Sequence, residues 1–128
     1  MSKSRFENLE IYQLSEKLAD LIWDLVLSWD HFAKETIGKQ IVDSTDSIGS
    51  NIAEGSGKGR DLDFKRYCKI ARGSLFETKH WLRRAYKRKL LKASDIKDIK
   101  NILDELLPKL SAYINFLEER IQKRNDSQ

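Results

Sequence analysis

The final third of the chain contains a row of apolar residues that recur every three or four positions. Because an α-helix completes a turn in about 3.6 residues, this spacing places the whole row on one side of a long helix. Its members are Ile99, Leu103, Leu106, Leu110, Ile114, Leu117 and Ile121. Such a helix is stable in water only when other helices cover its apolar side, so the row predicts a helical bundle.

Three earlier segments have the same helical period and supply the partners. We expect helices over about Asn8–Trp29, Ala33–Glu54 and Asp61–Lys89, in addition to a helix from Ser94 onward. No segment has the alternation of apolar and polar residues that is typical of a strand. Four helices with short connections predict an all-α fold, an antiparallel up-and-down four-helix bundle. The chain of 128 residues is expected to form a single domain, with a core over about 6–122 and a frayed tail over 123–128.

Residues with special backbone preferences mark the expected helix ends. Asp61 and Ser94 are candidate N-caps, because their side chains accept hydrogen bonds from free backbone N–H groups. The glycines of segment 55–59 are expected to end the second helix. Pro108 lies within the last apolar row, and the row continues in phase beyond it, so we expect a kink at this position rather than a helix end.

Composition narrows the class of protein. Cys68 is the only cysteine, so the chain cannot form an internal disulfide or a cysteine-rich zinc site. The N-terminal residues lack the apolar centre of a signal peptide, and no run reaches the roughly 18 apolar residues of a membrane-spanning helix. We therefore expect a soluble, cytoplasmic protein with no membrane partner, no metal and no cofactor.

Basic charge is concentrated in one third of the chain. The formal net charge is only +4, but segment 58–92 has thirteen basic and three acidic residues, whereas segment 1–33 has three basic and six acidic residues. In the third expected helix, six cations fall in one band away from the apolar side, Arg84 widens the band, and Phe76 lies within it. The six cations are Lys65, Lys69, Arg72, Lys79, Arg83 and Lys87.

This band predicts a surface that binds RNA or DNA. A row of cations along a helix spans several phosphates, and an aromatic side chain such as Phe76 among them provides a platform for an unpaired base. Two other interpretations remain open at this stage. The band is a solvated helix face, or Phe76 is buried against another subunit.

The second expected helix carries small and polar residues beside its apolar row. They are Gln40, Ser44, Ser47, Asn51 and Glu54. Small side chains permit the close approach of another helix, and a buried amide or carboxylate needs a specific hydrogen-bond partner. We expect Gly55, Gly73, Ser74 and Glu77 to complete the same packing or oligomer surface. For Asn51 and Glu54, a role in packing is favoured over direct contact with a ligand.

Two motifs in these helices resemble a known family. The motifs are Asn-Ile-Ala-Glu-Gly over 51–55 and Gly-Ser-Leu-x-Glu over 73–77, with Phe6, Leu9, Gln40–Ile41 and Ser47–Ile48 as further matches. The chain resembles, over about Phe6 to Leu117, the bacterial four-helix-bundle family first noted in intervening sequences of large-subunit ribosomal RNA genes.

The resemblance implies an up-and-down bundle that assembles into a ring-like homopentamer and has no established enzymatic activity. The chain is also similar to a related protein, the accessory variability factor of diversity-generating retroelements, a positively charged pentamer that binds nucleic acid and a reverse transcriptase. The chain has Asp43 and Ser44 where the family usually has arginine shortly after the Gln–Ile pair. A nucleic-acid role of that basic position therefore does not carry over.

Three classes of function follow. We expect a non-catalytic oligomeric bundle that binds RNA or DNA through its third helix. The alternative is a structural scaffold that docks a protein partner and has no specific nucleic-acid role. An enzyme is disfavoured, because the single Glu-x-x-His spacing, Glu77 to His80, has no second copy and no glycine-rich phosphate loop is present. The residues that could still supply acid, base or ligand groups are Asp43, Asp46, Glu54, Glu77, His31 and His80.

Overall fold

The computed structural model describes residues 5–127, and every regular element in that range is a helix. A 3-10 turn, η1 (Arg5–Asn8), precedes α1 (Glu10–Leu27). The short α2 (His31–Ala33) and the π-helical turn η2 (Lys34–Gly38) lead directly into α3 (Lys39–Gly57). The second expected helix is therefore one helical segment with a change of hydrogen-bond pattern near its start.

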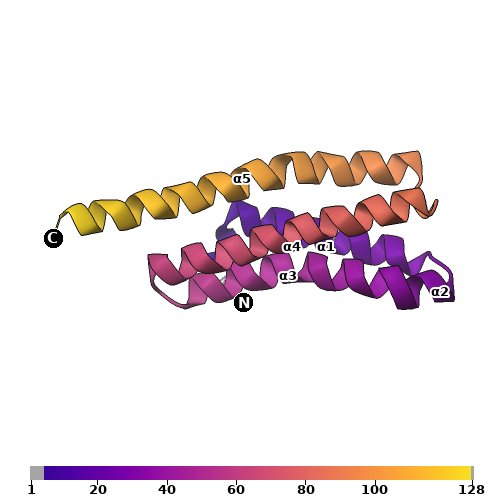
Figure 1. Ribbon diagram of the computed structural model, residues 1–128, viewed down its shortest axis with the longest axis horizontal. Coiled ribbons are helices and arrows are strands. Elements are labelled where there is room, and N and C mark those ends of the chain that lie inside the picture. The colour runs from indigo at the N-terminus through magenta and orange to yellow at the C-terminus, as the bar shows by residue number, and fades with distance from the viewer. Residues whose placement is uncertain (1–4, 128) are drawn as a thin grey trace.

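Two longer helices, α4 (Asp61–Lys87) and α5 (Ala93–Asp126), complete the fold. The long helices α1, α3, α4 and α5 lie side by side along one axis (Figure 1). Within residues 5–127, the backbones of α1 and α3, α3 and α4, α4 and α5, and α5 and α1 lie close together, whereas the backbones of the diagonal pairs do not. The predicted antiparallel up-and-down four-helix bundle is confirmed. In this arrangement, the face formed by α1 and α3 is opposite the face formed by α4 and α5.

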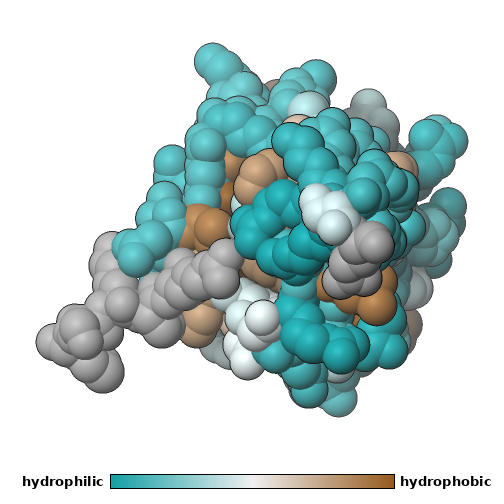
Figure 2. Space-filling model, turned by 90° about the vertical axis from the view of Figure 1, so that its left-hand side faces the viewer, coloured by the Kyte–Doolittle hydropathy of each residue, from teal (hydrophilic) through white to brown (hydrophobic). Residues whose placement is uncertain are grey.

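The core lies between the long helices and contains the predicted apolar rows. In α5, the buried members of the row are Ile99, Leu106, Leu110, Ile114 and Leu117. Leu103 and Ile121 are only half-buried. Hydrophilic residues cover most of the bundle end shown in Figure 2, and hydrophobic residues are visible there in recesses between them. Burial of apolar surface is thus the main force that holds the four helices together.

The two predicted N-caps are wrong. The N-cap of α4 is Arg60, and Asp61 lies in the first helical turn. The N-cap of α5 is Lys92, whose backbone N–H donates to Asp95 Oδ2 at 2.9 Å, so Asp95 supplies the cap that was expected from Ser94. In both helices the carboxylate lies within the first turn rather than at the N-cap, and its negative charge is favourable near the helix N-terminus.

Gly55 was expected to help end the second helix, because glycine is common at helix C-termini. The helix instead continues past it. α3 continues to Gly57, and Gly55 is buried against α4. A Cβ atom at Gly55 would lie 2.6 Å from Tyr67 Cβ, so this glycine permits close packing of the two helices. The chain turns after it at Gly59, whose φ of +81° lies in the left-handed region that favours glycine.

The end of α5 is more ordered than expected. The helix continues through Pro108 and changes direction along its length, and its C-terminal end extends past the turn between α3 and α4 (Figure 1). The segment that was expected to fray is helical as far as Asp126, and Gln128 lies outside the described residues. Arg120 Nε and Arg124 NH2 lie 3.0 Å and 2.9 Å from Oδ2 of the buried Asp61. This ionic contact connects the last turns of α5 to the first turn of α4.

Candidate nucleic-acid interface

The cations of α4 are placed by the apolar side of the same helix. Phe64, Cys68, Ala71, Leu75 and Leu82 are buried in the core. Because these residues fix the rotation of α4, the remaining sides of the helix carry its charged residues. The cations are nevertheless not all equivalent, because some border α5.

Two of the predicted nucleic-acid-binding residues are engaged by α5. Lys65 forms an ion pair with Glu118, and this hydrogen bond and charge lower the pKa of the Glu118 carboxyl. Arg72 Nη1 donates to Ser111 Oγ at 3.3 Å, and the Arg72 side chain is half-buried. Both residues hold α4 to α5 within one chain. The sequence pattern missed this role because it did not specify which side of α4 borders α5.

The other predicted cations are available to a ligand. Lys69, Lys79, Arg83 and Lys87 are exposed and Arg84 is half-buried. Among the described residues, none of these five has an ion-pair partner within 4 Å, in contrast with Lys65. Lys69 is nevertheless near enough to Glu118 to contribute to the lowered pKa of that carboxyl, whereas no such carboxylate in the described chain is paired with the other four.

Phe76 is a large apolar side chain on the surface of the same helix. Its exposed fraction is 53%. The Lys79 Nζ atom lies 5.6 Å from the centre of the Phe76 ring, which is the geometry of a cation–π contact. An exposed aromatic ring next to an unpaired cation is suited to stacking on a base while the cation contacts a phosphate.

The polar seam of the second helix lies mainly inside the chain. Thr78 Oγ1 is 2.9 Å from Ser44 Oγ, and Ser47 Oγ is 3.0 Å from Ser74 Oγ. Asn51 Nδ2 donates to the Ser47 carbonyl oxygen at 2.7 Å. The two hydroxyl pairs join α3 to α4, whereas the Asn51 bond lies within α3 and satisfies its amide beside this interface. A packing role for Ser44, Ser47, Asn51 and Ser74 is what this geometry supports.

The remaining members of the predicted packing surface face outward. Gln40, Glu54 and Glu77 are exposed, and Glu77 accepts a hydrogen bond from Trp81 Nε1 at 3.1 Å. No heavy atom lies within 4 Å of the Cβ position of Gly73, so the close helix approach expected there does not occur within the described chain. Helical period alone could not separate the residues of α3 and α4 that face each other from those that face solvent.

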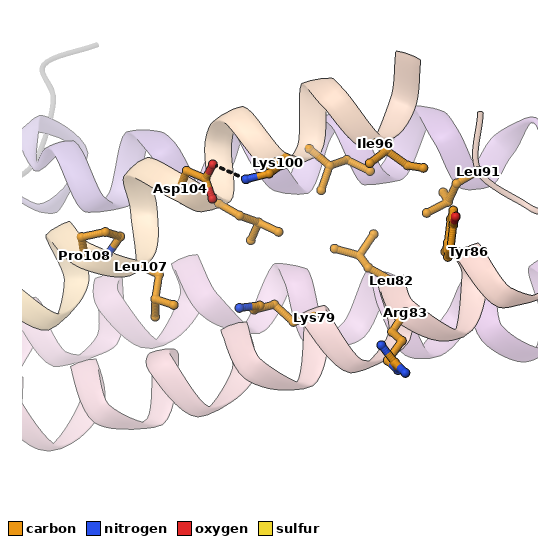
Figure 3. Close-up of a pocket in the computed structure, with 12 residues that line it drawn as sticks. Lys79, Leu82, Arg83, Tyr86, Leu91, Ile96, Lys100, Asp104, Leu107 and Pro108 are labelled. Atoms are coloured by element: carbon orange, nitrogen blue, oxygen red, sulfur yellow. Dashed lines mark hydrogen bonds and ion pairs between the residues drawn. The ribbon is translucent and has the colours of Figure 1, made fainter. Parts of the chain in front are cut away.

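A groove of about 720 Å³ between α4 and α5 was not anticipated from the sequence (Figure 3). Apolar side chains form much of its lining, among them Leu82, Ile96, Ile99, Leu103 and Leu107. Lys79 and Arg83 line it from α4, and the Lys100–Asp104 ion pair, at 2.8 Å, lines it from α5. The sequence predicted that the whole apolar row of α5 would be buried. The structure shows that α4 and α5 are separated along part of this row, which leaves that part open to solvent.

The candidate acid, base and ligand residues form no metal-binding cluster in the described part of the chain. No group of three or more His, Cys, Asp and Glu residues is placed to hold a metal ion within residues 5–127. Burial raises the pKa of the Cys68 thiol to about 12, so this cysteine is not a thiolate at neutral pH.

None of the helices in the described range has the length and apolar character that a membrane span requires.

Comparisons with known proteins give a consistent assignment. No curated protein matches the chain. A crystal structure of a protein of unknown function from the S23 ribosomal protein family of Bacteroides thetaiotaomicron is similar, with a TM-score of 0.71 and 26% sequence identity. The match covers 81% of this chain and 97% of that one. The sequence profile described as 23S rRNA-intervening sequence protein matches residues 7–112. The chain therefore belongs to the 23S rRNA-intervening sequence protein family.

Proposed function

We propose that this protein is a non-catalytic, cytoplasmic assembly of helical bundles that binds RNA or DNA through the exposed side of α4. The observation that carries the proposal is the set of unpaired cations around the exposed Phe76 ring. Lys69, Lys79, Arg83, Arg84 and Lys87 lie on one rigid helix, and none has an ion-pair partner in the described chain.

The dimensions of this surface suit a nucleic-acid backbone. The helical rise of 1.5 Å per residue places Lys69 and Lys87 about 27 Å apart along α4. A duplex carries roughly one phosphate charge per 1.7 Å of axis, so several phosphates fall within this length. Binding through three to five such contacts would make the logarithm of affinity fall with the logarithm of salt concentration with a slope of about −2.7 to −4.5.

Self-association would strengthen such a contact. The family resemblance supports a homopentamer, in which five copies of α4 would bind one polyanion together. Linked sites of this kind raise the overall affinity well above that of a single site, provided that the ligand reaches more than one of them. The description of the family, which refers to 23S ribosomal RNA, makes structured RNA the first ligand to test.

The test is fluorescence anisotropy of labelled structured RNA, duplex DNA and polyglutamate over a salt series. We expect tighter binding of a nucleic acid than of polyglutamate, and a steep salt slope. The variant Lys69→Glu/Arg84→Glu/Lys87→Glu should weaken binding at least tenfold and flatten the slope. These three side chains lie outside the α4–α5 groove.

A matched control carries the same change of charge on the other side of the bundle. Lys17→Glu/Lys34→Glu/Lys39→Glu alters α1, η2 and α3 and should lower affinity much less. Equal losses in the two variants would show that only net charge matters. Equal binding of all three polyanions would contradict a nucleic-acid role.

The scaffold alternative is favoured by a different observation. Trp23, Leu27 and Phe32 have exposed fractions of 54%, 56% and 76%, and these side chains have no role in nucleic-acid binding on α4. Large exposed apolar side chains that lie near one another often mark a protein interface. These side chains favour the second candidate function, a scaffold that docks a protein partner and has no specific nucleic-acid role.

A further inference from the structure

The α4–α5 groove lacks an occupant in the single chain. Leu103 and Leu107 are half-buried although they belong to the apolar side of α5. The groove follows α5 from Ile96 to Leu107, which corresponds to about 16 Å at the helical rise of 1.5 Å per residue. A partner that fills it needs an apolar strip of about three helical turns.

The rim of the groove is positively charged. Lys79 and Arg83 have no ion-pair partner within the described residues, whereas Lys100 is neutralised by Asp104. In Figure 3, the cations of α4 lie along one side of the groove, and the Lys100–Asp104 pair lies on the other. Charge complementarity therefore requires a partner strip with acidic residues beside its apolar ones.

The opposite face of the same bundle carries such a strip. Glu16, Asp20, Trp23 and Leu27 follow one side of α1 at spacings of three and four, and all four side chains are exposed. They lie on the side of α1 that borders α3, because Trp23 is three turns from Tyr12, and Tyr12 packs beside Gly49 of α3. We call these four residues the α1 ridge.

Acidic residues of α3 extend the negative charge of the ridge. Partial burial of Asp46 raises the pKa of its carboxyl, and the nearby charges of Asp43 and Asp20 raise it further. Like charges held together in this way are stabilised when a cationic surface covers them. The ridge from Glu16 to Leu27 is also about 16 Å long, which equals the length of the groove.

We propose that the α1 ridge of one copy docks into the α4–α5 groove of the next copy. Trp23 and Leu27 would cover the apolar lining, while Asp20 and the neighbouring carboxylates of α3 would face Lys79 and Arg83. The contact is head-to-tail, since it joins two different surfaces on opposite faces of the bundle, and it generates a closed ring or an open chain of copies. The inference rests on the self-association in the proposed function and identifies the surfaces that meet.

The pairing divides the cations of α4 between two roles. Lys79 and Arg83 lie at the joint between copies. Lys69, Arg84 and Lys87 do not line the groove and stay available to nucleic acid. The two proposals can therefore be tested with different variants.

The experiment measures native mass by sedimentation for two separately broken surfaces. Trp23→Glu disrupts the α1 ridge, and Lys79→Glu/Arg83→Glu disrupts the α4–α5 groove. All three positions are exposed, so each variant should fold. Circular dichroism checks that it does. We expect a multiple of the chain mass for the unmodified protein and a single-chain mass for each variant. Leu62→Glu, at another exposed apolar residue on α4, is the control and should keep the native mass.

Mixing the two variants gives the decisive result. Each variant retains one intact surface, so the mixture should form pairs of one copy of each and nothing larger. Single chains in the mixture would overturn the head-to-tail pairing. If the variants separately keep the mass of the unmodified assembly, the copies meet elsewhere and only this pairing fails. If the unmodified protein is a single chain, self-association itself is wrong, and the anisotropy test of nucleic-acid binding still stands separately.

Discussion

Two glycines show how differently the same residue type acts within this bundle. Gly55 is buried where α3 meets α4, and Gly73 lies on the open side of α4. Both glycines were predicted to belong to the packing surface, and of the two only Gly55 lies at a close helix approach within the described chain. The neighbours of a small residue, which lie far away in sequence, decide its role.

We predict opposite effects of alanine at the two positions. In Gly55→Ala, the new Cβ would meet Tyr67 Cβ at 2.6 Å, and overpacking should lower the free energy of unfolding by about 1–3 kcal/mol. In Gly73→Ala, the new Cβ meets nothing, and the gain in helix propensity should raise this free energy by about 0.5–1 kcal/mol. Chemical denaturation of both variants checks the prediction. Equal midpoints would contradict the packing of Gly55.

Asp46 offers a prediction for the dependence of stability on pH. Burial and the charges of Asp43 and Asp20 raise the pKa of Asp46 above its ordinary value of 3.8. A carboxyl whose pKa is raised by folding favours the folded state at low pH, and this contribution is lost as pH rises through the folded-state pKa. At pH 7, Asp46→Asn should therefore raise the melting temperature by about 1–3 °C. The difference should shrink near pH 3, and a constant difference would rule out charge as its cause.

At the scale of elements, hydroxyl groups rather than apolar contacts alone join α3 to α4. Thr78 Oγ1 lies 2.9 Å from Ser44 Oγ and 2.9 Å from the Ser74 carbonyl oxygen. Thr78→Val keeps the shape of the side chain and removes these contacts. We predict a loss of about 1–2 kcal/mol in the free energy of unfolding. Thr36→Val, where the hydroxyl bonds locally to Phe32 on the surface, is the matched control and should cost less.

The end of α5 provides a second prediction at this scale. Asp61 lies in the first turn of α4 and holds Arg120 and Arg124. Asp61→Asn removes the negative charge, so the last turns of α5 should open more often. Hydrogen exchange in residues 118–126 should become at least several-fold faster, while exchange in α3 stays unchanged. Protection that persists in the variant would mean that the ion pairs do not hold the extension.

Much of each element was predictable from local pattern, and the relations between elements were not. The 3.6-residue period located all four long helices and most of the core, including Leu106 and Leu110. The ends were less accurate, because Asp61 faces arginines more than fifty residues away. Likewise, the period placed Lys65 and Arg72 in a band with Lys69, and only the position of α5 shows that the first two have partners.

At the scale of the whole molecule, charge is distributed between opposite faces. Acidic residues gather on the face of α1 and α3, and unpaired cations gather on α4 beside α5. We predict that added salt weakens the proposed assembly of copies as well as the proposed nucleic-acid binding, because each proposal depends on contacts between exposed charges. Native mass should fall toward that of one chain as salt rises, in sedimentation runs at fixed protein concentration. An assembly that grows with salt would indicate a contact made by apolar surface alone.

The single thiol in the core makes the protein its own reporter of opening. Cys68 is fully buried within α4, and at neutral pH it is held in the protonated, unreactive form. A thiol-specific dye can modify it only when the bundle opens far enough to admit the dye. The rate of labelling therefore measures how often the native structure opens, without any introduced probe. The same rate, recorded with and without RNA, would show whether the ligand stabilises the fold.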